Sequence, residues 1–507
     1  MRVFLTYRDR DLDLDAGPPA NADELVQDLG LEILFGAMAA GDRYLFDVAR
    51  SAVLSGLDEV DAIRYRQAVL ADCVEHPDAV RELYAIAVEA IERERRSWMF
   101  AARNADSLLY RSVELMSIFV GLLRRLRLVA DAHGTAFRSE GFTRLFGEIV
   151  RELDDPYLQS VELHLRRLRL TDGVRMSAQL GPANVGTSYV LRRRAGKRSL
   201  RERVGLPEPG SYVWELPDRD DAGAEALAEI RGHGIALAAA SLARSTEHIL
   251  SYFAHLRSEL GFYVGCLNLH DALKRREAPT CQPDPAPAGE PTLVARGLYD
   301  PCLRLSMDRP TIGSDVDASG KALVVITGAN RGGKSTFLRS LGLAQLMMQC
   351  GLFVAATSFR ADLRRGVFTH FKREEDASLR AGKLDEELAR MSTIVDHVLP
   401  GSLILLNESF ASTNEREGSE IGRQIVGALL DEGVAVAYVT HMFDLARSFQ
   451  VERRERALFL RAERLPDGER TFRLIEGDPL PTSHGEDIFR RVFGDDPADQ
   501  GVAAEVV

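Results

Sequence analysis

The sequence predicts a multidomain chain, in which an all-α region with a small β-hairpin insertion is followed by an α/β domain. Helical periodicity dominates residues 23–170 and returns over 222–276. Beyond a proline-rich stretch at 278–289, strand-like apolar runs alternate with helical segments, which is typical of an α/β domain with a largely parallel sheet. The expected divisions are a helical region at 1–277, a linker at 278–290 and an α/β domain at 291–507.

Composition and charge narrow the class of protein. The 507 residues are 45% hydrophobic and 28% charged, which suits roughly two to four globular domains. Five scattered cysteines without a CxxC pair favour a reducing cytoplasm and argue against a disulfide scaffold or a zinc site. The charged N-terminus lacks the apolar region of a signal peptide, and no apolar run is long enough to span a bilayer. We therefore expect a cytoplasmic protein, compatible with association with the nucleoid, and no membrane partner.

A hairpin and a basic cluster interrupt the helical region. Met176–Leu180 and Ser188–Leu191 flank a turn that contains Gly181 and Gly186, which predicts a hairpin within an insertion at about 175–216. Basic residues follow it directly: Arg192, Arg193, Arg194, Lys197, Arg198, Arg201 and Arg203. Such a cluster is either a solvated loop or a set of contacts to a phosphate backbone, and both interpretations stay open. The net charge of −12 argues against coating nucleic acid with the whole surface, but it permits a local basic groove.

The segment Gly328–Ser335 fits the phosphate-loop pattern GxxxxGK[ST]. An apolar run, 322–326, precedes it, and an amphipathic helix that ends at Gly351 follows it. The glycines let backbone N–H groups face one anion, and the N-terminus of the helix adds its positive end. We expect a nucleotide here, with Lys334 reaching the terminal phosphates and the Ser335 hydroxyl on Mg²⁺.

Two further strand ends carry polar residues. The apolar run 402–406 ends in Asn407 and Glu408, which is the Walker B arrangement when it lies downstream of a phosphate loop. Its first residue is normally an aspartate that holds Mg²⁺, and its second orients the attacking water. Asn407 keeps an oxygen acceptor but lacks the charge. Another buried run, 434–440, leads to His441, which is either structural or a contact to the γ-phosphate or the water.

The remaining expected elements of the α/β domain complete the alternation. A helix at 415–432 ends before Gly433, and it separates the last two of these runs. The expected strands are 324–327, 367–371, 403–406, 434–440, 457–460 and 472–475.

Together these blocks resemble the MutS family of DNA mismatch-repair ATPases. TGANRGGKST resembles the phosphate-loop block of that family, with Arg331 in place of its usual methionine, and NESFASTNEREG resembles the Walker B and signature block. VTHMFDLA resembles its histidine loop, GLYDPCLRL the segment that frames the adenine, and residues 481–485 a block near its C-terminus. Before residue 170 the likeness is limited to helical character.

The resemblance implies an ABC-type P-loop ATPase domain that follows a helical core and lever, with a DNA-gripping clamp at the hairpin. It implies a short form without the mismatch-recognition and connector domains. Phe146-Gly-Glu148 resembles the Phe-x-Glu mismatch wedge of the family, but it lies inside a helical pattern, so we expect a chance match. Lys334, Glu408 and His441 would be catalytic, Ser335 and Asn407 would hold Mg²⁺, and Ser412 and Asn414 are candidates for reaching the ATP of a partner subunit. The nucleotide-binding residues would be Gly328, Ala329, Asn330, Arg331, Gly332, Gly333, Lys334, Ser335 and Thr336.

Two functions from different classes are consistent with these residues. The first is a MutS-like homodimeric ATPase that couples ATP and Mg²⁺ to DNA binding in mismatch repair or recombination-related DNA maintenance, with hydrolysis slowed by Asn407. The second is a nucleotide-gated dimerising interaction protein without DNA specificity. The basic cluster from Arg192 to Arg203 distinguishes them, because only the first needs it for binding DNA.

Overall fold

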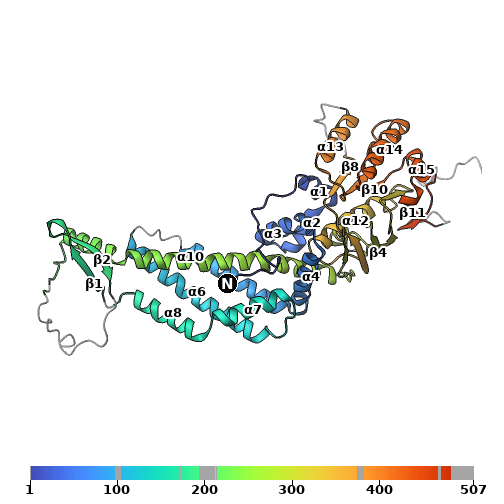
Figure 1. Cartoon of the computed structure of the whole chain (residues 1–507). Helices are drawn as coiled ribbons and strands as arrows, with labels where there is room; N and C mark the ends of the chain where they lie inside the picture. The colour runs from blue at the N-terminus through green and yellow to red at the C-terminus, as the bar shows by residue number, and fades with distance from the viewer. Residues whose placement is uncertain are drawn as a thin grey trace, which may run out of the picture. The chain divides into compact units, whose positions relative to one another are not determined.

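The computed structural model describes residues 2–97, 104–171, 173–192, 212, 214–373, 382–465 and 470–480. By their internal contacts these residues form two compact units (Figure 1), each described here by itself. The first unit contains 78–138 and 142–260 with the first residues of the chain, and the second contains 4–77, 139–141 and the chain from 261 onward. These units do not follow the three-part division expected from the sequence, which stays a prediction.

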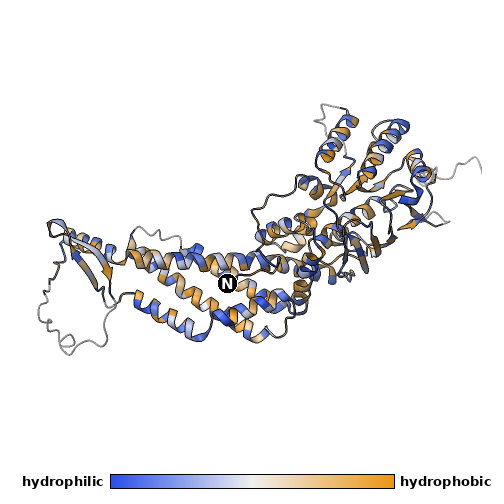
Figure 2. Ribbon diagram, in the orientation of Figure 1, coloured by the Kyte–Doolittle hydropathy of each residue, from blue (hydrophilic) through white to orange (hydrophobic). Residues whose placement is uncertain are grey.

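The first unit is built from long helices, as the periodicity predicts. Hydrophobic and hydrophilic residues alternate along them (Figure 2), so each helix has an apolar side to bury. The N-terminus of α6 is closed by a capping box between Asn104 and Ser107. The helices are α5 (Pro77–Ser97), α6 (Ala105–His133), α7 (Glu140–Glu152), α8 (Asp155–Leu168) and α10 (Asp221–Lys274), the last of which continues into the second unit.

The predicted hairpin is present. Strands β1 (Met176–Leu180) and β2 (Gly186–Leu191) pair antiparallel and are joined through the short helix η1 (Pro182–Asn184). The hairpin lies against α10, where the ring of Tyr189 stacks on His233 at 5.8 Å. Of the basic cluster, Arg192 donates to the Ser177 hydroxyl at 2.8 Å. Arg193, Arg194, Lys197, Arg198, Arg201 and Arg203 lie outside the described residues.

A parallel sheet forms the centre of the second unit. Within the described residues it has six strands in the order β12-β11-β6-β10-β9-β8, of which all but β12 run parallel. The six expected strands are therefore confirmed. The five parallel strands are largely apolar and buried, whereas β12 is an antiparallel edge strand with several polar residues. Their bounds are β6 (Leu323–Thr327), β8 (Val367–Phe371), β9 (Leu403–Asn407), β10 (Ala435–Val439), β11 (Ala457–Arg464) and β12 (Arg470–Glu476).

Helices cover this sheet and bury its apolar strands. The main core cluster includes Leu406, Phe410, Tyr438 and Phe449, all at most 1% exposed. The expected helix before Gly433 is α14, and the helix that follows the glycine loop is α12. The bounds are α12 (Lys334–Gln349), α13 (Lys383–His397), α14 (Glu415–Asp431), α15 (Phe443–Glu452) and the short helix η2 (Arg454–Arg456).

A second sheet, not expected from the sequence, lies in the same unit. Its order is β3-β7-β4-β5, with strands β3 (Asp284–Ala286), β4 (Leu293–Leu298), β5 (Ser314–Asp317) and β7 (Ser358–Asp362), and α11 (Pro301–Ser306) between β4 and β5. Strand β3 lies inside the stretch expected to be a linker and pairs with β7, and Cys281 pairs with Val354. The backbone of this stretch is thus hydrogen-bonded to a sheet instead of forming a linker without regular structure. Its prolines are tolerated because β3 is an edge strand.

The first helices of the chain belong to this second unit. Helix α1 lies against the edge strand β8, where the Asn21 amide donates to the Val367 carbonyl at 2.7 Å. In the part of the chain that the structure describes, no helix is long and apolar enough to cross a membrane. The helices are α1 (Ala22–Leu29), α2 (Leu31–Ala39), α3 (Arg43–Leu54) and α4 (Val60–Glu75).

Candidate functional site

The sequence-predicted site residues meet where three parallel strands end. Strand β10 lies between β6 and β9, with Val439 paired to both Ile326 and Asn407. The carboxyl ends of parallel strands share one edge of the sheet, and ligands of α/β proteins bind at that edge. The glycine loop after β6, Glu408 after β9 and the segment after β10 that contains His441 therefore come together, as the alternation predicts.

The glycine loop adopts backbone angles that its sequence permits. Gly328 and Gly333 have φ of 111° and 91°, in the left-handed region that glycine enters without strain. Arg331, the departure from the family pattern, is exposed and also has a positive φ of 58°. Gly333 directly precedes Lys334, the first residue of α12, so the unpaired N–H groups of that helix begin in the loop.

Lys334 is buried inside the loop that it closes. Its ammonium donates to the carbonyl oxygens of Gly328 at 2.8 Å and Ala329 at 3.1 Å, and to the Asn330 side chain at 3.4 Å. Burial lowers the pKa of Lys334, and the nearby Glu408 carboxylate opposes this shift. The loop thus holds a partly desolvated cation that gains from a bound anion.

Ser335 and Asn407, the two predicted metal ligands, are in direct contact. The Ser335 hydroxyl donates to the Asn407 amide oxygen at 2.9 Å. Glu408 follows with a positive φ of 53°, while its N–H donates to the Val439 carbonyl at 2.8 Å. Two neutral oxygen donors therefore lie side by side next to one carboxylate. Among the described residues no group of three His, Cys, Asp or Glu side chains is arranged to hold a metal ion.

His441 is exposed on the loop after β10. The preceding Thr440 donates its N–H to Ile326 at 3.0 Å, and Phe443 donates its N–H to the Glu415 carboxylate at 2.9 Å. These bonds tie both ends of the segment to β6 and α14. The segment is thus held at both ends, and the role of His441 stays a prediction.

The two candidates for the trans contact are both engaged within the chain. Asn414 caps α14, its side-chain oxygen accepting from the N–H of Glu417 at 3.0 Å. The Ser412 hydroxyl donates to the Glu387 carboxylate on α13 at 2.8 Å. Glu387 was not among the predicted site residues, although its sequence position gives a signal. It falls at helical spacing between Leu384 and Met391, where an apolar side chain is expected.

The hairpin of β11 and β12 covers the glycine loop, a contact that the sequence does not predict. A Cβ on Gly328 would lie 2.9 Å from the backbone nitrogen of Ala462, and one on Gly333 would lie 2.9 Å from the Phe472 carbonyl oxygen. Arg470 on β12 contributes to lowering the pKa of Lys334. The glycines are therefore also required by the close approach of the hairpin.

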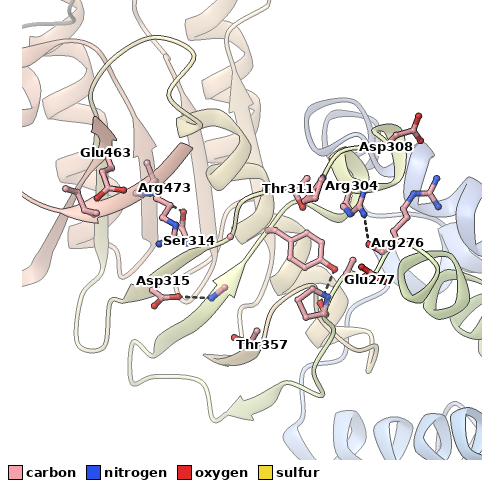
Figure 3. Close-up of a pocket in the computed structure, with 18 of the residues that line it drawn as sticks. Arg276, Glu277, Arg304, Asp308, Thr311, Ser314, Asp315, Thr357, Glu463 and Arg473 are labelled. Carbon is pink, nitrogen blue, oxygen red and sulfur yellow. Dashed lines mark hydrogen bonds between the residues drawn. The ribbon is translucent and has the colours of Figure 1, made fainter. Parts of the chain in front are cut away.

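A cavity of about 950 Å³ lies in the same unit, with Arg304, Asp315, Glu463 and Arg473 among the residues that line it (Figure 3). Glu463 lines both this cavity and the smaller hollow beside Gly328 and Ala329, so the two adjoin. The segment predicted to frame an adenine contributes Gly297, Tyr299 and Arg304 to the cavity wall. Arg304 donates to the Arg276 carbonyl at 2.5 Å, and the Gly297 N–H donates to the Asp315 carboxylate at 2.8 Å (Figure 3).

The second unit is an α/β arrangement with a glycine loop at the N-terminus of a helix, at the edge of a parallel sheet where α/β proteins bind ligands. Comparison with known proteins identifies the family. The family model for the MutS2 N-terminal domain matches residues 58–276, and that for MutS domain V matches residues 324–489. The chain therefore belongs to the MutS family.

Curated relatives agree with this assignment. The DNA mismatch repair protein MutS of Chloroflexus aurantiacus is 30% identical over 189 residues, which is 34% of this chain and 20% of that protein. MutS protein homolog 4 of Mus musculus is 28% identical over 155 residues, or 30% of this chain and 16% of that protein. The chain thus matches about a fifth of the length of these relatives. The match from residue 58 extends the family relationship into the helical region, where the sequence blocks indicated only helical character.

Proposed function

We propose that this chain binds ATP with Mg²⁺ at the Gly328–Ser335 loop, hydrolyses it slowly, and couples the cycle to DNA binding in mismatch repair or related DNA maintenance. The observation that carries the proposal is the contact of Ser335 with Asn407 beside Glu408, directly under the loop and the N-terminus of α12. Family membership supports nucleotide use and action on DNA.

In this proposal each residue has a distinct task. The N–H groups of the loop and of α12 bind the phosphates, and the Lys334 ammonium exchanges its carbonyl partners for phosphate oxygens. Glu408 polarises the attacking water, and His441 contacts the γ-phosphate. The adenosine part occupies the 950 Å³ cavity beside Glu463.

The residues present fit Mg²⁺, but weakly. Ser335 and Asn407 offer two neutral oxygens within 2.9 Å of each other, and Mg²⁺ in nucleotide sites takes its remaining ligands from phosphates and water. The missing carboxylate at position 407 lowers the affinity of the protein for the ion. When bound, Mg²⁺ would neutralise charge on the β- and γ-phosphates.

A second subunit would complete the site. We propose that the chain forms a homodimer through the α/β domain at 291–507, with the loop of Ser412 and Asn414 facing the nucleotide of the partner. The N-terminus of α14, which Asn414 caps, offers a positive helix end for that contact.

DNA binding would involve the β1–β2 hairpin and the basic residues from Arg192 onward. The hairpin exposes Leu180 and Val185, which are 79% and 61% exposed, next to Arg192 in the sequence. Replacing the basic residues by glutamine should weaken DNA binding and lower the slope of log affinity against log salt by about one for each phosphate that is no longer bound. Glutamine at the exposed Arg43 and the half-buried Arg50 of α3 is the control. Unchanged DNA affinity would favour the nucleotide-gated interaction protein without DNA specificity.

The test of the catalytic proposal is Glu408→Gln. We expect ATP binding to persist while hydrolysis falls by about 10²-fold or more, because the water loses its polarising carboxylate. Glu432→Gln is the control, an exposed change just after the C-terminus of α14. It should leave ATP binding and hydrolysis unchanged. Hydrolysis is measured alone and with homoduplex, mismatched and branched DNA. Turnover by the Glu408→Gln variant equal to that of the unmodified chain would remove Glu408 from this role.

A further inference from the structure

Glu387 is a buried carboxylate that contacts the loop after β9. Only 6% of the residue is exposed, and its Oε1 accepts the Ser412 hydroxyl proton at 2.8 Å. Its Oε2 has no hydrogen-bond partner among the described residues. A buried carboxylate with a single neutral donor is costly, and it becomes costlier if that donor leaves.

The surroundings of Glu387 hold the loop backbone in place. The Glu387 carbonyl lies 3.0 Å from His370 Nε2, and the Ser409 hydroxyl lies 2.7 Å from His370 Nδ1. Burial lowers the pKa of His370 to about 4, so the ring is neutral at pH 7. Because a carbonyl only accepts, the single ring proton is assigned to Nε2. The one proton of the Ser409 hydroxyl then has two acceptors at 2.7 Å, His370 Nδ1 and the His370 carbonyl oxygen.

Two more contacts fix the same stretch of loop. The Phe410 ring stacks on His370 at 5.4 Å, and the Tyr438 hydroxyl donates to the Ser409 carbonyl at 2.6 Å. With Ser409 and Phe410 held in this way, the Glu387 carboxylate acts on one further group of the loop, the Ser412 hydroxyl. That hydroxyl has a single proton, which it can give either to Glu387 or to another acceptor.

Building on the proposed function, we propose that Glu387 is a positioning residue that holds the Ser412 hydroxyl in a resting orientation. Contact between Ser412 and the nucleotide of a second subunit then requires the Ser412 hydroxyl to break its hydrogen bond to Glu387. The γ-phosphate must outcompete a buried carboxylate, so assembly of the two-subunit site is opposed until ATP is bound on the facing subunit. Glu387 touches no substrate and acts only through Ser412.

The substitution Glu387→Gln tests this coupling. The glutamine amide is close in shape to the carboxylate, and its N–H can donate to the Ser412 oxygen, which frees the hydroxyl proton. In a Glu408→Gln background that retains ATP, we expect half-maximal dimerisation at about ten-fold lower ATP, measured by sedimentation velocity. The affinity of the monomer for ATP, measured by equilibrium binding at low protein concentration, should not change. Glu386→Gln, the neighbouring residue on α13, should behave like the Glu408→Gln parent.

A double-mutant cycle with Ser412→Ala separates coupling from a general packing role. Ser412→Ala should weaken ATP-dependent dimerisation, and adding Glu387→Gln should then have no further effect. Ser412→Thr, which keeps a hydroxyl, should restore the effect of Glu387→Gln on ATP-dependent dimerisation. The proposal would be overturned if Glu387→Gln shifted the ATP concentration for half-maximal dimerisation equally with and without the Ser412 hydroxyl, or if it caused no shift in either background. If the unmodified chain bound no ATP or its dimerisation ignored ATP, the proposed function would fail, and this proposal with it.

Discussion

The Ser335 hydroxyl donates a 2.9 Å hydrogen bond to the Asn407 amide oxygen, which joins the first turn of α12 to the end of β9. An aspartate at position 407 could accept the same bond and would add a negative charge beside the phosphates of the proposed nucleotide. The structure therefore separates two properties that usually coincide at this position. The geometry of the strand end is kept, while the charge that attracts a divalent cation is absent.

The first prediction follows from this separation. Asn407→Asp should lower the Mg²⁺ concentration for half-maximal ATP hydrolysis by about ten-fold, equivalent to ~1.4 kcal/mol of metal binding. Titration of the hydrolysis rate with Mg²⁺ measures it. Nucleotide binding without metal should not improve, because an added carboxylate repels phosphate. If the aspartate variant needs as much Mg²⁺ as the unmodified chain, Asn407 has no part in binding the ion.

The second prediction concerns the close approach of α14 to the loop after Glu408. A Cβ built on Gly418 collides with the carbonyl oxygen of Phe410, a fully buried residue. Gly418→Ala should displace that loop, costing about 1–3 kcal/mol of unfolding free energy and reducing ATP hydrolysis. Gly427→Ala on the same helix is the control. Among the described residues only Arg453 comes within 4 Å of its added Cβ, so it should be neutral or mildly stabilising. Equal effects of the two alanines on stability and hydrolysis would contradict the prediction.

The parts of this fold that the sequence predicts most directly are the strands formed by uninterrupted apolar runs. Residues 323–326 and 435–439 are apolar throughout, so their burial as parallel strands needs no knowledge of the rest of the chain. The second sheet was missed because β3 is three residues long with a proline, and β7 holds three polar residues in five. Such strands are stabilised by their partners more than by their own pattern.

The contacts of the candidate site also fall into those that the sequence predicts and those that it does not. Ser335 and Asn407 are 72 residues apart, yet their contact follows from two strands that run parallel in one sheet. No such rule predicts the hydrogen bond between Glu387 and Ser412, because that bond depends on where α13 packs. The contact of the hairpin with Gly328 spans more than 130 residues, but it follows from the parallel pairing of β11 with β6, which sets Arg461 opposite Thr327.

The third prediction is a pH dependence that arises from His370. Burial holds the pKa of this histidine at about 4, below the unfolded value of about 6.5. Between these values the unfolded chain binds a proton that the folded chain does not, so stability is complete above pH 6.5 and declines as the pH falls toward 4. The full loss is about 3 kcal/mol.

Comparison with His370→Gln isolates this contribution. The unfolding free energy of the unmodified chain, followed by denaturant titration between pH 7 and 4, should fall more steeply than that of the variant. His397→Gln, an exposed change on α13, should keep the steep slope. Identical slopes for the unmodified chain and His370→Gln would show that His370 is not held neutral.

The last prediction concerns Arg66, a fully buried guanidinium that joins the N-terminal segment to the end of α12. It donates to the Thr6 carbonyl at 2.9 Å and the Cys350 carbonyl at 3.1 Å, and it lies over the rings of Tyr7 and Phe262. Arg66→Ala leaves both carbonyls without this donor and opens a cavity, so we expect a loss of about 3–5 kcal/mol by denaturant unfolding.

Arg64, two residues earlier on α4, supplies the control for Arg66. Its exposed side chain pairs with Asp284 at 3.4 Å, and exposed ion pairs contribute little. Arg64→Ala should therefore change the unfolding free energy by less than about 1 kcal/mol. Arg66→Lys should fall between the two alanine variants, because an ammonium keeps the charge but cannot donate to both carbonyls in the planar geometry of a guanidinium. A loss for Arg66→Ala as small as that for Arg64→Ala would mean that these buried hydrogen bonds do not hold the N-terminal segment on α12.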